Sequence, residues 1–220
     1  MRISKNTKIL FGVLTILILA LTFTEVKSVY DATKVTKSTE AEKTSLEIGP
    51  YSVSITQSEY EKLIQSELTT ALESKKNKDI VNSVTKYFIS DYFSLRDKPN
   101  FNSVGGTGFV FSKVKKQFTK NAISGYYMDL EQYKNTYGAE NLPLVNKVTI
   151  VKTTKVNKTK VATSETKTTK VGGVYDVQVK WTYEANEKLS TKSIIKKAKV
   201  RLVSNPETKV WYVYDIEAIA

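Results

Sequence analysis

Residues 175–184 read Tyr-Asp-Val-Gln-Val-Lys-Trp-Thr-Tyr-Glu, and apolar and polar side chains alternate along the whole stretch. Alternation with a period of two predicts a β-strand that has one buried face and one solvated face. We therefore expect a sheet that is covered on one side only, with Trp181 and Tyr183 on the covered side.

Further strands are predicted on both sides of this stretch. Before it, a strand begins near Val148 and is followed by a turn at 157–158 and a Thr-rich return strand over 159–169. After it, alternating apolar positions predict another strand, with Ile194, Ala198, Val200 and Leu202. The last stretch, 210–216, is apolar or aromatic on both faces except at one aspartate, which predicts a strand in the centre of an antiparallel sheet.

The chain before residue 145 has the apolar spacing of helices. Thr56 and Glu59 form a capping box that predicts the start of a first helix. The apolar positions of this helix are Tyr60, Leu63, Ile64, Leu68, Ala71 and Leu72. A second helix is predicted to begin with Asp79 as its cap and to end at 97–100. Its aromatic positions include Tyr87, Phe88 and Tyr92.

Two shorter helices are expected over 113–122 and 129–137, after a glycine-rich stretch at 104–108. That stretch lacks the Lys-Ser/Thr ending of a phosphate-binding loop and is interpreted as a plain loop. Because helices come first and antiparallel strands come last, we predict an α+β fold with the helices packed on one face of a curved sheet. The aromatic residues expected to face the helices are Trp181, Tyr183, Tyr212 and Tyr214.

The N-terminus carries a membrane signal. Residues 9–23 contain no charge and follow Arg2, Lys5 and Lys8. The large apolar side chains of the run include Ile9, Phe11, Leu14, Leu17, Leu19, Leu21 and Phe23. A spanning helix needs about 20 apolar residues, and a secretory signal needs an apolar core of about 7–15. An uncleaved anchor over 9–26 and a cleaved signal both fit, and a buried core helix is a third interpretation because no charge breaks the run on any face.

The first two interpretations share one orientation, because basic residues before an apolar segment stay in the cytoplasm. Residues 1–8 would form a cytoplasmic tail, the polar stretch 27–53 a flexible stalk, and 54–220 one extracytoplasmic domain. The predicted location is the cell membrane, with a single pass. Secretion is the alternative if the segment is cleaved.

The composition excludes several kinds of chemistry. The 220-residue chain has no Cys and no His. No disulfide can hold the exported domain together, and zinc sites, Cys-His nucleophiles and Ser-His-Asp triads are excluded. We expect no cofactor, no metal site and no enzymatic activity, although chemistry based on carboxylates alone stays open.

Positive charge is concentrated in the second half of the chain. The net charge is +12, and residues 145–220 hold 15 basic and 7 acidic side chains. A field of this kind attracts nucleic acid, anionic lipid or wall polymers. The candidate contacts are Lys152, Lys155, Lys158, Lys160, Lys167 and Lys170. We favour the alternative that these lysines keep a sheet soluble and protect its edges, because only three arginines are present and aromatic residues do not alternate with the lysines.

Two segments carry a resemblance to a known superfamily. Residues 86–93 read Lys-Tyr-Phe-Ile-Ser-Asp-Tyr-Phe at the aromatic end of the second predicted helix, and residues 210–217 read Val-Trp-Tyr-Val-Tyr-Asp-Ile-Glu in the last predicted strand. With the preceding helix pair, they resemble the nuclear-transport-factor-2-like superfamily over 54–220. The resemblance implies a cone in which helices pack on a curved antiparallel sheet.

A short inside tail, one span, a stalk and one such cone resemble the VirB-eighth-subunit-like proteins, which are scaffold subunits of type IV secretion and conjugation channels. The Lys/Thr/Asn-rich composition without Cys is similar to Gram-positive members. The resemblance implies self-association and contacts with other channel subunits, and it provides no catalytic residues. Gram-positive members often carry two such domains, whereas this chain has room for one.

Two other functions remain open. A secreted or wall-associated protein could bind anionic polymers through its basic sheet. A cone of the ketosteroid-isomerase or dehydratase type would need a carboxylate in an apolar pocket, and Asp91 and Asp215 lie beside aromatic residues. The side chains that would line such a pocket are Tyr87, Tyr92, Tyr183 and Tyr214. Such aromatic spacing more often marks a core than a pocket, so we expect the scaffold function.

Overall fold

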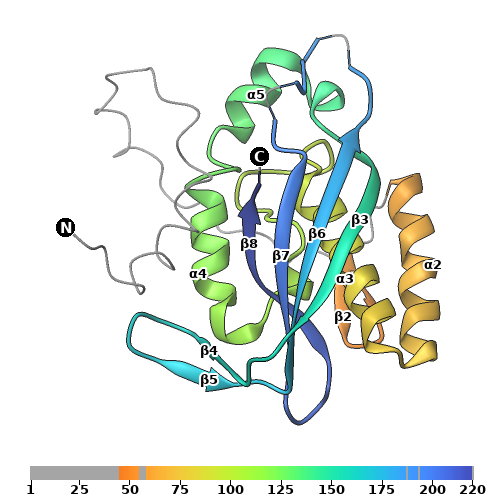
Figure 1. The fold of residues 1–220 in the computed structure, drawn as a ribbon. Helices are drawn as coiled ribbons and strands as arrows, with labels where there is room; N and C mark the ends of the chain where they lie inside the picture. Colours follow the sequence, from red (N-terminus) through yellow and green to blue (C-terminus); the bar gives the residue numbers. More distant parts are fainter. Residues whose placement is uncertain (1–44, 55–57, 187, 193, 220) are drawn as a thin grey trace.

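The computed structural model describes residues 45–54, 58–186, 188–192 and 194–219. Its centre is a curved antiparallel sheet of four strands in the order β3-β6-β7-β8, with helices beside it (Figure 1). The strands are β3 (Val145–Val156), β6 (Gly173–Tyr183), β7 (Lys197–Ser204) and β8 (Trp211–Ala218). The predicted α+β class is confirmed.

Strand β6 follows the predicted alternation. Val177, Val179 and Trp181 are buried on the face toward α3 (Asn77–Phe93), whereas Gln178 and Lys180 are exposed on the other face. β6 pairs with β3 on one side and with β7 on the other, so it lies inside the sheet. Alternation therefore located the strand and its faces correctly.

Strand β8 lies at an edge of the sheet, which corrects the prediction of a central strand. Both of its faces are covered, and this explains its apolar sequence. Beyond its edge, Val110 forms a parallel bridge with Val213, and the Phe111 N–H donates to the Val213 carbonyl at 2.8 Å. The register with β7 shifts by one residue, which leaves Tyr214 as a bulge.

The predicted return strand over 159–169 is also wrong. The segment forms a separate two-stranded hairpin of β4 (Lys160–Ala162) and β5 (Thr168–Lys170), and β3 pairs with β6 instead. Val161 is buried, but the Thr and Lys residues around it provide no continuous apolar face. A strand without such a face has little to bury against α3, so β6 takes the place beside β3.

Helix α2 (Glu59–Ser74) is capped by Ser58 and Glu61. The Glu61 N–H donates to Ser58 Oγ at 3.1 Å, and the Ser58 N–H donates to Glu61 Oε2 at 3.0 Å. The predicted box of Thr56 and Glu59 is therefore displaced, since Glu59 is the first helical residue and Thr56 lies outside the described residues. The two boxes are two residues apart, and both match the same sequence pattern.

Helix α3 starts three residues earlier than predicted, because Lys76 rather than Asp79 is its N-cap, and it ends at Phe93 rather than near 97. The two shorter predicted helices are confirmed as α4 (Ser112–Ile123) and α5 (Leu130–Tyr137). Single 3-10 turns flank them, η2 (Thr107–Phe109) and η3 (Ala139–Asn141).

A hairpin that the sequence did not predict precedes α2. It consists of β1 (Ser45–Ile48) and β2 (Tyr51–Ser54). Tyr51 is fully buried, stacks on Phe109 at 4.9 Å between ring centroids, and donates its hydroxyl to the Trp211 carbonyl at 2.7 Å. The hairpin belongs to the packed domain, so the predicted stalk over 27–53 extends too far.

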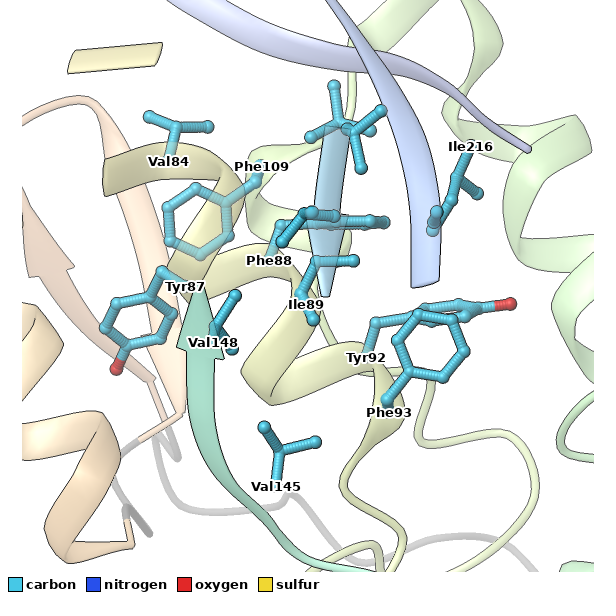
Figure 2. Close-up of a cluster of buried hydrophobic side chains, with 14 of the residues drawn as sticks. Val84, Tyr87, Phe88, Ile89, Tyr92, Phe93, Phe109, Val145, Val148 and Ile216 are labelled. Atoms are coloured by element: carbon cyan, nitrogen blue, oxygen red, sulfur yellow. The ribbon is translucent and has the colours of Figure 1, made fainter. Parts of the chain in front are cut away.

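The main core lies between α3 and the sheet. In Figure 2, Tyr87, Phe88 and Tyr92 of α3 point toward residues of η2, β3 and β8, among them Phe109, Val148 and Ile216. A smaller cluster lies on the opposite face of the sheet, under the β4–β5 hairpin. Its buried members are Phe111, Val161, Val171, Val174 and Val203.

In the part of the chain that the structure describes, no helix combines the length and apolarity that a bilayer requires. The predicted membrane segment over 9–26, with its tail and the stalk up to residue 44, lies outside the described residues.

Candidate functional site

Five of the aromatic residues that the sequence singled out form one buried cluster between α3 and the sheet. They are Tyr87, Phe88, Tyr92, Trp181 and Tyr183. Phe93 stacks on Trp181 at 4.4 Å between ring centroids, and Phe88 stacks on Tyr92 at 5.5 Å. Burial raises the pKa of Tyr183 to about 12, which keeps its hydroxyl protonated at neutral pH. These side chains pack against one another and form part of the hydrophobic core rather than the lining of a pocket.

Tyr214 does not join that cluster, and Tyr212 reaches only its margin, where its ring meets the Tyr51 ring edge-on at 5.9 Å between centroids. This corrects the expectation that both face the helices. Both pack against the smaller cluster on the other face of the sheet. The Tyr214 hydroxyl donates to the Ala162 carbonyl of β4 at 2.5 Å, and the Tyr212 ring contacts Phe111. Tyr212 lies between the buried residues Trp211 and Val213, and Tyr214 occupies the bulge of β8. Tyr214 therefore helps to hold the β4–β5 hairpin on the sheet.

Asp91 lies at the C-terminal end of α3 and is engaged by groups around it. Its carboxylate forms an ion pair with the buried Lys98 and accepts a hydrogen bond from the Gly106 N–H at 2.7 Å. Next to it, the Gly105 N–H donates to the Tyr127 hydroxyl at 3.0 Å. The glycine-rich loop is thus a support for α3 rather than a ligand cradle.

Glu61 is a second buried carboxylate beside this pair. It is 4 % exposed and accepts a hydrogen bond from Ser90 Oγ at 3.3 Å in addition to its bond at the helix cap. Burial raises the pKa of Glu61, and the nearby charge of Asp91 adds to this increase. The sequence prediction missed this cluster, because the cap was placed two residues too early and the glycine-rich stretch at 104–108 was treated as a plain loop.

Asp215 lies on the outer face of the sheet, on the side opposite α3. It pairs in register with Arg201, whose guanidinium donates two hydrogen bonds of 2.7 Å to Asp176. Burial raises the pKa of Asp215, an effect that Arg201 opposes. The structure therefore does not bring Asp215 together with Tyr87 or Tyr183. No group of acidic residues within the described ranges has the arrangement of a metal site.

A groove lies between α2 and β3, and it includes surface that no other element covers. β3 is one of the two edge strands of the sheet, and the Tyr60 hydroxyl accepts a hydrogen bond from its Val148 N–H at 2.8 Å. Leu63 projects from α2 into solvent and is 58 % exposed. The side chains that line the groove include Leu63, Glu67, Thr70, Asn82, Lys86, Val148 and Ile150. The groove is open and of mixed polarity, as protein-binding surfaces often are.

All six lysines that the sequence proposed for anion contact are exposed, on β3, on the hairpin and in the loops beside them. The structure adds a second group on α4 that the sequence analysis overlooked. These residues are Lys113, Lys115, Lys116 and Lys120, and all are exposed. The signal was present in the sequence, since no Asp or Glu occurs between Asp97 and Asp129.

No protein-family model, no curated protein and no solved structure matches this chain.

Proposed function

We propose that this protein is a membrane-anchored, extracytoplasmic scaffold subunit of a conjugative type IV secretion channel, which acts by binding other proteins. The observation that carries the proposal is the α2–β3 groove. There a helix face with an exposed leucine runs beside the edge strand β3. The N-terminal apolar run supports the anchor, and the resemblance over 54–220 supports the channel.

The groove offers two kinds of contact to a partner. Leu63 and Ile150 provide apolar area, and Leu63 is too exposed to contribute much to the core of the monomer. An added strand, which is a common mode of peptide recognition, would pair with the edge of β3 after Val148, because the Val148 N–H already donates to the Tyr60 hydroxyl. Glu67 and Lys86 form an ion pair of 2.6 Å at the rim, where charge fixes register more than affinity.

The proposed partners are other subunits of the channel and further copies of this chain. The two candidate catalytic carboxylates favour a binding function over catalysis. Asp91 is held by Lys98 and Gly106, and Asp215 lies on the face of the sheet opposite Tyr87 and Tyr183.

The test is Leu63→Glu in the full-length protein, expressed in cells that carry the whole transfer machinery. We expect recovery of the other channel subunits with the variant to fall about tenfold, because a charge in a buried apolar contact is costly. The thermal unfolding midpoint should stay unchanged, since residue 63 is exposed.

The matched control is Met128→Glu, which changes a side chain that is 57 % exposed and belongs to the segment between α4 and α5 rather than to the groove. It should leave recovery at the parent level. Equal recovery for the parent and Leu63→Glu would contradict the groove as the binding surface, and full-length protein found free in the cytosol would contradict the anchor.

The alternative is a released protein that binds anionic wall polymers through its lysines. The observation in its favour is the number of exposed lysines without an ion pair on β3, the hairpin and α4. The intact mass of the mature protein separates the two functions, because the alternative requires loss of the N-terminal segment.

A further inference from the structure

Helix α4 is a cationic element without acidic neighbours on its own chain segment. Its exposed lysines at 113, 115, 116 and 120 take part in no ion pair among the described residues. The other side of the helix packs on the core through Val114, Phe118 and Ala122. The lysine side of α4 therefore points away from the protein.

Tertiary packing joins this helix to the lysine-rich hairpin. Phe111 and Val114, at the start of α4, pack with Val161 of β4 and with Val171 just after β5. Figure 1 shows the β4–β5 hairpin at one end of α4. The two elements form one basic surface, which we call the α4–hairpin surface. Its lysines are Lys113, Lys115, Lys116, Lys120, Lys158, Lys160, Lys167 and Lys170.

The chemistry of this surface fits a diffuse anionic layer better than a nucleic acid. Its cations are all lysines, which act as hydrated point charges, whereas bidentate recognition of base edges favours the planar arginine fork. The tyrosines nearby, Tyr212 and Tyr214, are half-buried against the hairpin cluster, so part of their ring surface is taken up by packing rather than open to the stacking of bases. Glu165, in the hairpin turn, is the acidic residue on this hairpin.

The proposed anchor determines which anionic layer is nearest. Residues 27–44 separate the apolar segment from β1, and even a fully extended chain of this length spans at most about 65 Å. The domain is thus confined near the membrane, where lipid headgroups are at high effective concentration.

We infer that the α4–hairpin surface docks on anionic lipid headgroups of the membrane that holds the N-terminal segment, and so fixes the orientation of the domain. The α2–β3 groove, which lies beside α2 rather than α4, would then stay accessible to channel partners (Figure 1). This inference rests on the anchor in the proposed function.

The experiment uses the full-length chain reconstituted in phosphatidylcholine vesicles with or without phosphatidylglycerol. Because the chain has no Cys, Thr166→Cys in the exposed hairpin turn gives a single site for a donor dye, and acceptor dyes are placed on lipid headgroups. We expect energy transfer to be high only with phosphatidylglycerol and to fall as salt is raised.

The test variant removes four charges from the surface by Lys→Gln substitution, at Lys116, Lys120, Lys160 and Lys167. The ratio of docked to undocked protein should fall at least about tenfold. The control variant removes four charges elsewhere, at Lys62, Lys134, Lys188 and Lys192, and should dock as the parent does. All eight lysines belong to the described residues, and seven of the eight form no ion pair there, the exception being Lys62, whose pair with Glu59 is exposed.

Flotation of the chain with neutral vesicles at alkaline pH measures insertion separately. Failure to insert would overturn both the anchor and this inference. Insertion with equal energy transfer in neutral and anionic vesicles, or equal loss in both variants, would overturn this inference alone. Binding of duplex DNA that depends on the four surface lysines, without a response to phosphatidylglycerol, would assign the surface to nucleic acid and overturn it as well.

Discussion

At the residue scale, Glu61 and Asp91 are two carboxylates that are buried close to each other inside the fold. Both carboxylates are buried at the junction of α2, α3 and the glycine loop, and Lys98 is the cation that pairs with Asp91 there. Removing two carboxylates from water is costly unless each is paired or well hydrogen-bonded. Asp91 has both kinds of partner, whereas Glu61 relies on hydrogen bonds from Ser58 and Ser90.

We therefore predict that ionisation of Glu61 lowers the free energy of unfolding as the pH rises. Its pKa is raised in the folded state, so the folded protein holds this proton more tightly than the unfolded chain does. The stabilisation is complete below the unfolded pKa, about 4.3, and is lost as the pH rises through the higher folded pKa. Glu61→Gln keeps a capping-box side chain and cannot ionise. Urea unfolding at a series of pH values, from about 4.3 upward, should show that the free energy of unfolding falls less for the variant than for the parent. If the free energies of the two proteins change in parallel with pH, the prediction is wrong.

Gly108 is a position where only a hydrogen fits. A Cβ at this residue would lie 1.8 Å from the Ser52 carbonyl oxygen of β2, an atom that cannot move without the hairpin. We expect Gly108→Ala to lower the free energy of unfolding by about 3 kcal/mol, because overpacking forces backbone shifts. In the control Gly173→Ala, the nearest atom is a Trp211 ring carbon at 3.0 Å. Chemical denaturation should show a clearly smaller decrease in the free energy of unfolding for Gly173→Ala than for Gly108→Ala. Equal decreases would show that the close approach of Ser52 is not the cause.

At the element scale, α3 and the β4–β5 hairpin differ most in how much of each is buried. Most residues of α3 from Val81 to Phe93 are buried, and the helix contacts β3, β6 and β8. The hairpin has only three residues in each strand and rests on Val161, Val171 and the hydroxyl of Tyr214. The two elements should therefore differ in local stability, because opening free energy follows buried contact.

Hydrogen exchange measures this difference. We predict that the amides of β4 and β5 exchange through local opening, at rates several orders of magnitude above those of β6. Tyr214→Phe should speed exchange in the hairpin and leave β6 unchanged, because it removes only the bond to the Ala162 carbonyl. Equal protection in β4 and β6 would show that the hairpin opens only with the whole domain.

At the scale of the whole molecule, stability has to come from packing, since no disulfide is available and the net charge is +12. Like charges at this density repel one another and destabilise the compact state. The described ion pairs are mostly at the surface, for example Lys199 with Glu217, and contribute little.

We predict that the thermal unfolding midpoint of the protein rises when sodium chloride is added to a low-salt buffer, because screening weakens the net repulsion more than it weakens the few ion pairs. The variant in which Lys116, Lys120, Lys160 and Lys167 are replaced by Gln should show a smaller rise. Calorimetry at several salt concentrations checks both, and a midpoint that falls with salt would mean that attractive pairs dominate.

The sequence by itself determined the faces of single elements. Alternation placed Val177, Val179 and Trp181 of β6 on the buried side, and helical spacing identified α3 and its aromatic residues, because periodicity depends only on local backbone geometry. The absence of His and Cys excluded whole classes of chemistry without any structure.

Only the tertiary structure decided which elements meet. An apolar pattern on both faces of β8 fits a central strand and equally an edge strand covered by α3 on one side and the hairpin on the other, and the fold takes the second arrangement. Glu61 lies near Asp91, and α4 packs against the hairpin. In both cases the residues that meet are 30 or more positions apart in the sequence. Pairing across such separations depends on how buried faces fit together in space, which local periodicity does not encode.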